Sequence, residues 1–217
     1  MWSMVGTEYE GARMPTRLTA LDMELGGTTR LVGGRGCVSD FGLVRVSFVA
    51  VVGRPGVGKS SVLWEVIRNV SADCASVLCV SETLRVTAEV RATVTVRSSS
   101  SRMASTAKIE KELTKRPRHV LVLDDLAAVQ VDGPLPRMPR GSTRADRQMK
   151  AVCDWAHRIS RERRMCVIAS ARVDKAGRVS GQLIHASDAV VQLGGEANNV
   201  GFCALKNRFA KVLSRAA

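Results

Sequence analysis

One stretch of the chain, residues 53–60, constrains its fold more than any other, because it has the spacing of a phosphate-binding loop. It reads GRPGVGKS, which fits the pattern G-x-x-x-x-G-K-[ST]. In this pattern backbone N–H groups surround the β-phosphate of a nucleotide, and glycine is needed because a Cβ would block the close approach of the anion. The predicted nucleotide-binding residues are Gly53, Arg54, Pro55, Gly56, Val57, Gly58, Lys59, Ser60 and Ser61.

The residues on either side of the loop have the composition that this motif needs. Residues 44–52 form a β-branched apolar run that is typical of a buried strand. After the loop, apolar residues recur at helical spacing from Val62 to Val70. Because a strand, a phosphate loop and a helix follow in the expected order, we expect Lys59 to reach the β- and γ-phosphates and Ser60 to bind Mg²⁺.

A second predicted strand, residues 119–126, ends in two acids. Asp124 follows four apolar residues, as in strands that bring a carboxylate to a Mg²⁺ ion. Asp125 falls on the opposite pleat, so we predict Asp124 as the metal-binding acid. Glu82 follows another apolar run, residues 75–80, and is either a carboxylate beside the γ-phosphate or an ordinary exposed acid in a loop.

The remaining pattern alternates strands with helices. We expect a short helix in residues 16–27, helices at 107–117 and 148–164, a strand at 165–170 and a hairpin at 189–209. Residues 96–106, 131–144 and 171–182 are expected to be loops. This order predicts an α/β fold with a mostly parallel central sheet, helices on both faces and a C-terminal β-hairpin.

The composition indicates which class of binding partner and which cellular compartment to expect. The formal net charge of +13, supplied mostly by arginine, favours a polyanion such as DNA or RNA, although an ordinary basic surface has the same composition. The six cysteines form no C-x-x-C pair, so we expect no zinc site and a reducing compartment. With no apolar stretch of membrane-spanning length and no signal-peptide pattern at the start, the expected location is cytoplasmic, without membrane contact.

From residue 17 to residue 209, the order of motifs resembles the RecA superfamily of P-loop ATPases, most closely its RadA/Sms branch of bacterial DNA-repair ATPases. TRLTALDMELGG is similar to the lead-in of that branch, VLCVSE to its strand ending in a catalytic glutamate, and DKAGRVSG to one of its loops. LKNRF resembles the branch's signature K-N-R-F-G, which is more specific than the phosphate loop. The resemblance divides the chain into a tail, residues 1–16, and a RecA-like ATPase domain, residues 17–217.

The resemblance implies an ATPase that uses ATP and Mg²⁺, with Glu82 as the residue that orients the attacking water. Lys206 and Arg208 are implied to be catalytic across a subunit boundary, where they act on the neighbouring nucleotide of a hexameric ring or filament. The alternative to this catalytic role is that Lys206 and Arg208 form only a solvated basic end of the hairpin. The implied activity is to translocate on, or remodel, single-stranded or branched DNA in recombination and repair.

The resemblance also implies that two basic loops, each following a core strand, contact single-stranded DNA. Their few aromatic residues favour backbone electrostatics over base stacking. The predicted DNA-binding residues are Arg137, Arg140, Arg144, Arg147, Arg172, Lys175 and Arg178.

Two residues depart from the RadA pattern, since Arg172 stands where the branch usually has histidine and Ala210 replaces the final glycine of its signature. The branch's N-terminal zinc motif and C-terminal protease-like domain also have no counterpart in this sequence. Two other functions stay open. One is the core of a DnaB-like replicative helicase, and the other is a regulatory module in which ATP sets an assembly state and is hydrolysed slowly.

Overall fold

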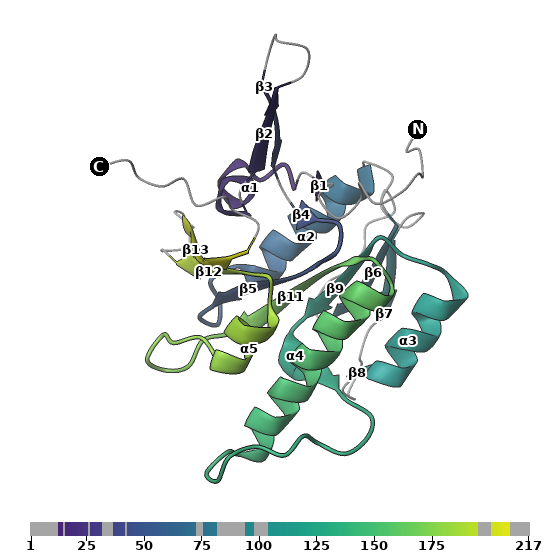
Figure 1. Cartoon of the computed structure of the whole chain (residues 1–217), viewed down its shortest axis with the longest axis vertical. Helices are drawn as coiled ribbons and strands as arrows, with labels where there is room; N and C mark the ends of the chain where they lie inside the picture. The colour runs from purple at the N-terminus through teal and green to yellow at the C-terminus, as the bar shows by residue number, and fades with distance from the viewer. Residues whose placement is uncertain are drawn as a thin grey trace.

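Figure 1 shows the computed structural model of the chain. The structure describes residues 13–14, 16–25, 27–31, 37–41, 43–72, 76–81, 94–97, 104–194 and 201–208. No helix in these ranges is both long enough and apolar enough to cross a membrane.

A seven-stranded sheet forms the centre of the fold, in the order β13-β12-β5-β11-β9-β6-β7. All neighbouring pairs are parallel except β12 and β13, which are antiparallel. The strands are β5 (Ser47–Gly53), β6 (Val77–Ser81), β7 (Val94–Arg97), β9 (Val120–Asp124), β11 (Cys166–Arg172), β12 (Ala189–Gly194) and β13 (Gly201–Asn207). The structure therefore confirms the predicted α/β class, the mostly parallel sheet and the C-terminal hairpin.

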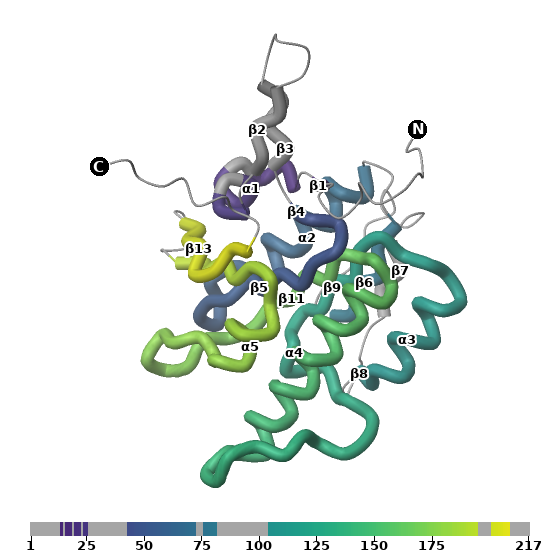
Figure 2. Tube along the Cα trace, viewed as in Figure 1, coloured from purple at the N-terminus to yellow at the C-terminus, as the bar shows by residue number. Residues whose placement is uncertain are grey.

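Helices cover both faces of this sheet, as expected for parallel strands that are apolar on both sides. Helices α1 (Thr19–Leu25) and α2 (Lys59–Ala72) pack on one face, against Val49, Val51 and Ile168 among others. Helices α3 (Thr106–Lys115), α4 (Arg144–Glu162) and α5 (Gly181–Ala186) pack on the other, over alternate strand residues such as Ala50. Figure 2 shows α4 crossing this second face, with α3 to one side and α5 to the other.

Three short strand pairs lie outside the main sheet. They join β1 (Arg13–Met14) to β4 (Leu43–Val44), β2 (Gly27–Leu31) to β3 (Cys37–Phe41), and β8 (Ala104–Ser105) to β10 (Val129–Gln130). Helix α1 docks on the edge strand β13, where the Ala204 N–H donates to Glu24 Oε2 at 2.6 Å. Because this bond uses an N–H of an edge strand, the lead-in helix and the C-terminal hairpin form one unit.

All three predicted loops contain regular residues in the structure. Residues 96–106 include the end of β7, the whole of β8 and the first residue of α3. Helix α4 begins at Arg144 rather than at residue 148, because the Thr143 and Asp146 side chains each bond to the other's backbone in a capping box. The predicted loop 171–182 contains the end of β11 and the start of α5. A short 3₁₀ turn, Leu126–Ala128, follows β9.

Candidate nucleotide-binding site

The predicted phosphate loop lies between β5 and α2, at the carboxyl edge of the sheet. Gly56 and Gly58 have φ angles of 82° and 94°, in the region that glycine adopts without a steric penalty. A Cβ on Gly53 would lie 2.8 Å from the Val57 side chain and 3.0 Å from the Leu193 carbonyl oxygen. The spacing of glycines is therefore a requirement of the backbone path, as the motif predicts.

Lys59 lies over the loop at the first residue of α2. Its Nζ donates to the carbonyl oxygens of Gly53 at 3.0 Å and Arg54 at 2.8 Å. Burial lowers its pKa, and the nearby carboxylate of Asp125 partly offsets this effect. A partly desolvated ammonium group whose hydrogen-bond acceptors are neutral carbonyls has no anionic partner among them, and it is well suited to bind phosphate oxygens.

Asp124 lies at the end of β9, where hydroxyl groups from three different elements converge on its carboxylate. Ser60 Oγ donates to Oδ1 at 3.0 Å, Ser170 Oγ to Oδ1 at 2.7 Å and Ser81 Oγ to Oδ2 at 3.1 Å. The side chain is buried, with 7% of the residue exposed. Parallel register brings these groups together, since Ser81 pairs directly with Asp124 and Ser170 follows the partner of Leu123.

This cluster fits a Mg²⁺ ion by the chemistry of its atoms. Ser60 and Asp124 supply hard oxygen ligands within hydrogen-bond distance of each other, while nucleotide phosphates and water supply the rest in such sites. Within the described ranges, no group of three or more His, Cys, Asp or Glu residues could hold a metal without a nucleotide. Ser60 and Asp124 were predicted from their motifs, whereas Ser81 and Ser170 were not, because their signal in the sequence is only that each follows a run of apolar residues.

Asp125 and Arg172 form an ion pair beside this cluster, with 3.0 Å between Arg172 Nε and Asp125 Oδ2. Arg172 ends β11, and its register partner on β5 is Gly53, the first residue of the phosphate loop. The structure thus places Arg172 at the nucleotide edge, although the sequence analysis grouped it with the DNA-binding residues. Its charge also lowers the pKa of Lys59.

The other predicted DNA-binding residues follow β10 and β11. Arg137 and Arg140 lie in the irregular segment before α4, and Lys175 and Arg178 lie in the turn after β11, all with exposed or half-buried side chains. Arg178 pairs with Asp174 at 2.9 Å, and the hydrogen bond from the Arg178 backbone lowers the pKa of this aspartate.

Arg144 and Arg147 differ from the prediction in their local structure. Both are exposed, but they lie in the first turn of α4 rather than in a loop. The capping box of Thr143 explains this difference, because it stabilises helix from residue 144 onward.

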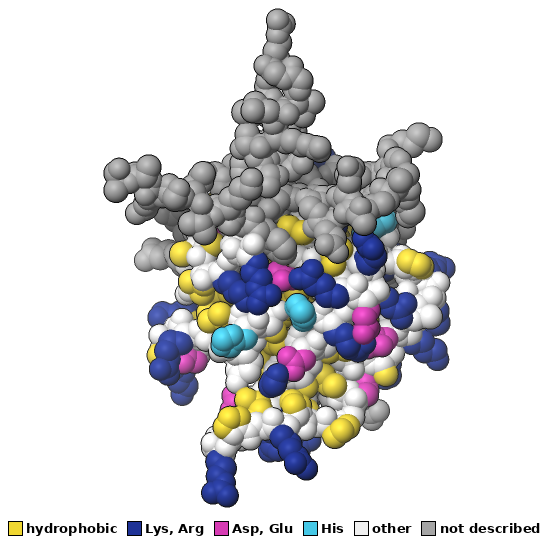
Figure 3. Space-filling model, in the orientation of Figure 1, with side chains coloured by type: hydrophobic (Ala, Val, Ile, Leu, Met, Phe, Trp, Pro, Cys, Tyr) yellow, Lys and Arg dark blue, Asp and Glu magenta, His cyan; other side chains and the backbone are white. Residues whose placement is uncertain are grey.

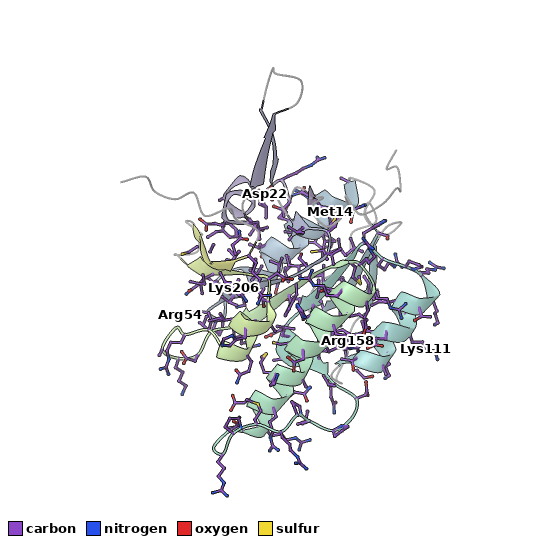
Figure 4. All side chains as sticks on the ribbon, in the orientation of Figure 1. Met14, Asp22, Arg54, Lys111, Arg158 and Lys206 are labelled. Atoms are coloured by element: carbon purple, nitrogen blue, oxygen red, sulfur yellow. The ribbon has the colours of Figure 1, made fainter. Side chains whose placement is uncertain are left out.

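The two basic residues of the LKNRF motif contact α5 and the turn that follows it. Lys206 lies between β13 and α5 (Figure 4), where its Nζ donates to the carbonyl oxygens of Ile184, His185 and Ser187. Burial lowers its pKa, and the charge of Arg208 lowers it further. Arg208 Nη1 lies 3.6 Å from Asp188 Oδ1, and its side chain is half exposed.

Glu82, the predicted water-orienting residue, lies outside the described residues, as do Phe209 and Ala210. The residue before Glu82 is Ser81, which ends β6 and bonds to Asp124.

A family model described as "ATPase family associated with various cellular activities (AAA)" matches residues 49–210. The match runs from the phosphate-loop strand through the C-terminal hairpin. No curated protein matches the chain in sequence.

Many solved structures have a similar fold, and two of them illustrate the likeness. One is the structure of an ATPase domain, which the chain matches with a TM-score of 0.58 at 15% identity, over 77% of this chain and 79% of that one. The other is a DnaB-like replicative helicase, solved in a study of its interactions with primase, which the chain matches with a TM-score of 0.57 at 15% identity. That match covers 76% of this chain and 53% of the helicase chain, so this chain corresponds to about half of that protein.

Proposed function

The chain belongs to the ATPase family associated with various cellular activities, and from this premise we propose that it is the ATP-driven motor core of an oligomer that acts on single-stranded DNA. The observation that carries the proposal is the contact between the phosphate-loop Ser60 and Asp124, beside Lys59. These residues come from two distant parts of the chain and meet where a nucleotide and its metal would bind.

In this proposal each part of the site has a separate role. Lys59 and the loop N–H groups bind the β- and γ-phosphates, and Ser60 and Asp124 hold Mg²⁺, which offsets phosphate charge when bound. Ser81 and Ser170 keep the Asp124 carboxylate aimed at Ser60. Glu82 orients the attacking water, a role that rests on the resemblance of VLCVSE to the RecA pattern.

We propose a DnaB-like architecture rather than a RadA-specific repair role. The similarity in fold to a DnaB-like replicative helicase supports this choice, whereas the RadA assignment rests on sequence motifs alone. The basic residues that follow β10 and β11 lie beyond the same carboxyl edge as the phosphate loop, so DNA bound there would be close to the nucleotide. We propose that Arg137, Arg140, Arg144, Arg147, Lys175 and Arg178 make this contact.

The contacts of Lys206 and Arg208 favour a second possibility, the slow regulatory ATPase. Both side chains bond within their own chain, to the end of α5 and to Asp188. A role in the neighbouring nucleotide site requires these contacts to open on assembly. If they open, the isolated chain is a poor ATPase that assembly on DNA activates, as the motor requires. If they stay closed, hydrolysis remains slow in the assembly, as the regulatory module requires.

The test is ATP turnover with and without oligothymidylate across a salt series. The motor predicts strong stimulation that fades as salt rises, because phosphate contacts are lost with salt. The Lys59→Ala variant should lose nucleotide binding and turnover, while Lys111→Ala, an exposed lysine on α3, should match the wild type. A turnover rate that ignores DNA at every salt concentration contradicts the motor and favours the regulatory module.

A mixing experiment tests the role of Arg208 across a subunit boundary. Each of Lys59→Ala and Arg208→Ala should be inactive alone, but their mixture should regain part of the activity because some boundaries contain both wild-type residues. Arg208→Ala is expected to lower the free energy of unfolding by about 1 kcal/mol or less, since the Arg208 side chain is half exposed and Asp188 keeps its contact with Arg161. No recovery at any mixing ratio contradicts the trans role.

A further inference from the structure

The ammonium group of Lys206 uses all of its hydrogen-bond donors within its own chain. A lysine ammonium has three N–H donors, and those of Lys206 bond to the carbonyl oxygens of Ile184, His185 and Ser187, the last two at 3.2 Å and 2.6 Å. These carbonyls belong to the end of α5 and to its C-cap residue, where a helix leaves carbonyl groups unpaired. Because a cation is also favoured at this end of the helix dipole, Lys206 caps α5.

Arg208, two residues later, is held less firmly than Lys206. Its Nη2 lies 3.4 Å from the His185 carbonyl oxygen and its Nη1 lies 3.6 Å from Asp188 Oδ1, and its side chain is half exposed. The second distance is too long for a hydrogen bond, and an ion pair whose arginine is half exposed contributes little. The backbone of Arg208 is fixed, since its N–H donates to the Asp188 carbonyl oxygen at 3.0 Å. The guanidinium of Arg208 can therefore turn toward a neighbouring chain while Lys206 stays in place.

Helix α5 joins the two edges of the sheet. It follows β11, which ends at the carboxyl edge, and it precedes β12, which begins at the amino edge. The turn directly before it, residues 173–180, contains the proposed DNA-binding residues Lys175 and Arg178. Arg208 follows β13, which is antiparallel to β12 and therefore ends at the amino edge. Figure 3 shows Lys and Arg side chains on this turn, at the left of the view, and again near the end of α5.

The turn before α5 is held by hydrogen bonds at its start and across its base. The Val173 N–H donates to the carbonyl oxygen of Gly53, the first residue of the phosphate loop, at 3.4 Å. The carboxylate of Asp174 accepts from both the N–H and the Nε of Arg178, at 2.8 Å and 2.9 Å. An ordered segment can pass a displacement on to the helix that follows it, because coupling needs elements that keep their shape.

Helix α5 depends on its neighbours for stability. It has six residues, too few to be stable alone, and its N-cap residue, Ser180, makes no side-chain capping bond. Leu183 is 1% exposed and anchors the helix in the core, and α4 packs beside it. Lys206 adds three hydrogen bonds between the end of α5 and the hairpin. A change at this contact therefore affects both the helix and the strand that carries Arg208.

We propose that Lys206 is a positioning residue that holds α5 to the hairpin, so that DNA bound at residues 173–180 sets the position of Arg208 through α5. Arg208 alone then reaches the nucleotide of the neighbouring chain. A phosphate could take Lys206 only if three carbonyls at the end of α5 lost their donor, a cost that Arg208 does not face. The inference rests on the proposed function, because it takes assembly on DNA as given and adds how DNA binding reaches the neighbouring site.

Hydrogen exchange of the wild type tests whether Lys206 leaves α5 on assembly. The amides to follow are those of Ile184 and Ser187, whose hydrogen bonds of 3.1 Å and 3.0 Å hold the two ends of the helix. The free chain is compared with the chain assembled on oligothymidylate with a non-hydrolysable ATP analogue. Exchange at these amides should slow or stay level on assembly, because α5 keeps its cap. Faster exchange would mean that Lys206 has left the helix, and it would overturn the inference.

The variant Lys206→Met tests the positioning role, since methionine is also unbranched but has neither charge nor donors. Its stimulation by DNA, the ratio of ATP turnover with and without oligothymidylate, should fall about tenfold, within the usual range of coupling between two sites. Its DNA affinity, measured by fluorescence anisotropy, should stay at the wild-type value, because Lys175 and Arg178 are intact. Exchange at residues 184 and 187 of the free variant should rise about tenfold, because the helix has lost its cap.

Two control variants should keep the wild-type stimulation by DNA. Lys150→Met removes an exposed lysine of α4 whose partner is Asp154, at 2.7 Å. Arg161→Gln removes a cation from Asp188, next to Arg208, and so weakens the fold close to the hairpin without touching the cap of α5. If Arg161→Gln loses stimulation as Lys206→Met does, general destabilisation explains both losses and the inference is wrong.

The remaining outcomes separate this inference from the proposed function. If Lys206→Met speeds exchange in α5 but keeps its stimulation by DNA, Lys206 only stabilises the helix and the inference is wrong. If stimulation is lost while exchange in α5 is unchanged, Lys206 acts outside α5, and the inference is wrong although the proposed function stands. If DNA does not stimulate the wild type, both are wrong. Should Lys206→Met fail to fold, the exchange of the wild type still decides.

Discussion

The two ends of the same parallel strands differ in how their charges are balanced. At the carboxyl edge, Asp124 accepts three hydroxyl hydrogen bonds, and Lys59 and Arg172 lie near acids. At the amino edge, Arg45, Arg118 and Arg164 each precede a core strand, and the buried carboxylate of Asp188 lies 2.9 Å from Arg161. In a parallel sheet every strand begins at one edge and ends at the other, so residues that precede strands and residues that follow them gather on opposite sides. The two edges therefore differ in chemistry: the carboxyl edge carries the candidate nucleotide site, and the amino edge carries a buried carboxylate paired with an arginine.

The largest expected effect separates the two acids at the carboxyl edge. Asp124→Asn should reduce ATP turnover at least about 100-fold, because we propose that the carboxylate that faces Ser60 holds the metal. Asp125→Asn should reduce it by about fivefold or less, because Asp125 forms a partly exposed ion pair with Arg172, worth about 1 kcal/mol or less. Steady-state ATP turnover at several Mg²⁺ concentrations measures the loss of activity in both variants. Equal losses for the two variants would mean that the metal is not held by Asp124 in particular.

An intermediate effect is expected at the amino edge, where Asp188 is the buried acid. Arg161→Gln should lower the free energy of unfolding by about 1–2 kcal/mol, because it removes a close cation from a buried carboxylate but Arg161 is itself nearly half exposed. Asp188 keeps the Phe48 N–H at 2.9 Å and the more distant Arg208. Urea unfolding measures the change, and ATP turnover should not move.

The matched control for this variant is Arg158→Gln, whose partners Glu110 and Glu162 are much more exposed than Asp188. Arg158→Gln should lower the free energy of unfolding by about 1 kcal/mol or less. If Arg158→Gln destabilises the protein as much as Arg161→Gln does, the burial of Asp188 does not increase the free energy that is lost with its ion pair.

The smallest expected effect is on pH dependence, because the proposed phosphate-binding cation is Lys59, whereas the proposed DNA-binding residues are mostly arginines. Burial lowers the pKa of Lys59 from 10.5, so Lys59 loses its proton earlier than an exposed lysine as pH rises. Nucleotide affinity should therefore fall as pH rises toward 10.5. The effect on folding has the opposite sign, since the cost of burying protonated Lys59 disappears as pH rises through its lowered pKa.

Arginine keeps its charge over this range, because its guanidinium loses its proton only at much higher pH than an ammonium group does. Affinity for oligothymidylate, measured on the same sample, should therefore stay level while nucleotide affinity falls. If both affinities fall together, one titrating group controls both nucleotide binding and DNA binding, and the two binding sites are not independent.

The parts of the fold that could be predicted are those whose cause is local. Residues 53–60 need glycine for their backbone path, and apolar runs identified β5, β9 and β11. The start of α4 was misplaced because its capping box stands among prolines and glycines that favour a loop. Helix α5 was missed because its six residues are too few to show a helical repeat.

The candidate site was only half predictable. Lys59, Ser60 and Asp124 belong to motifs that are contiguous in sequence, so their residue types and spacing were enough. Ser81 and Ser170 are ordinary serines until the register of β6 and β11 places them beside Asp124. The motif LKNRF was recognised as basic, but its contacts with the end of α5 depend on how the hairpin folds back.

The sequence by itself determined that this chain forms a phosphate loop between a buried strand and a helix, because backbone geometry and apolar periodicity are short-range properties. The tertiary structure alone decided which distant side chains share an edge. It placed Arg172 beside Asp125, brought three serine hydroxyls to one carboxylate and placed Arg161 beside the buried Asp188. The physical reason is that strand order and register are set by the packing of the whole sheet, and no single segment contains them.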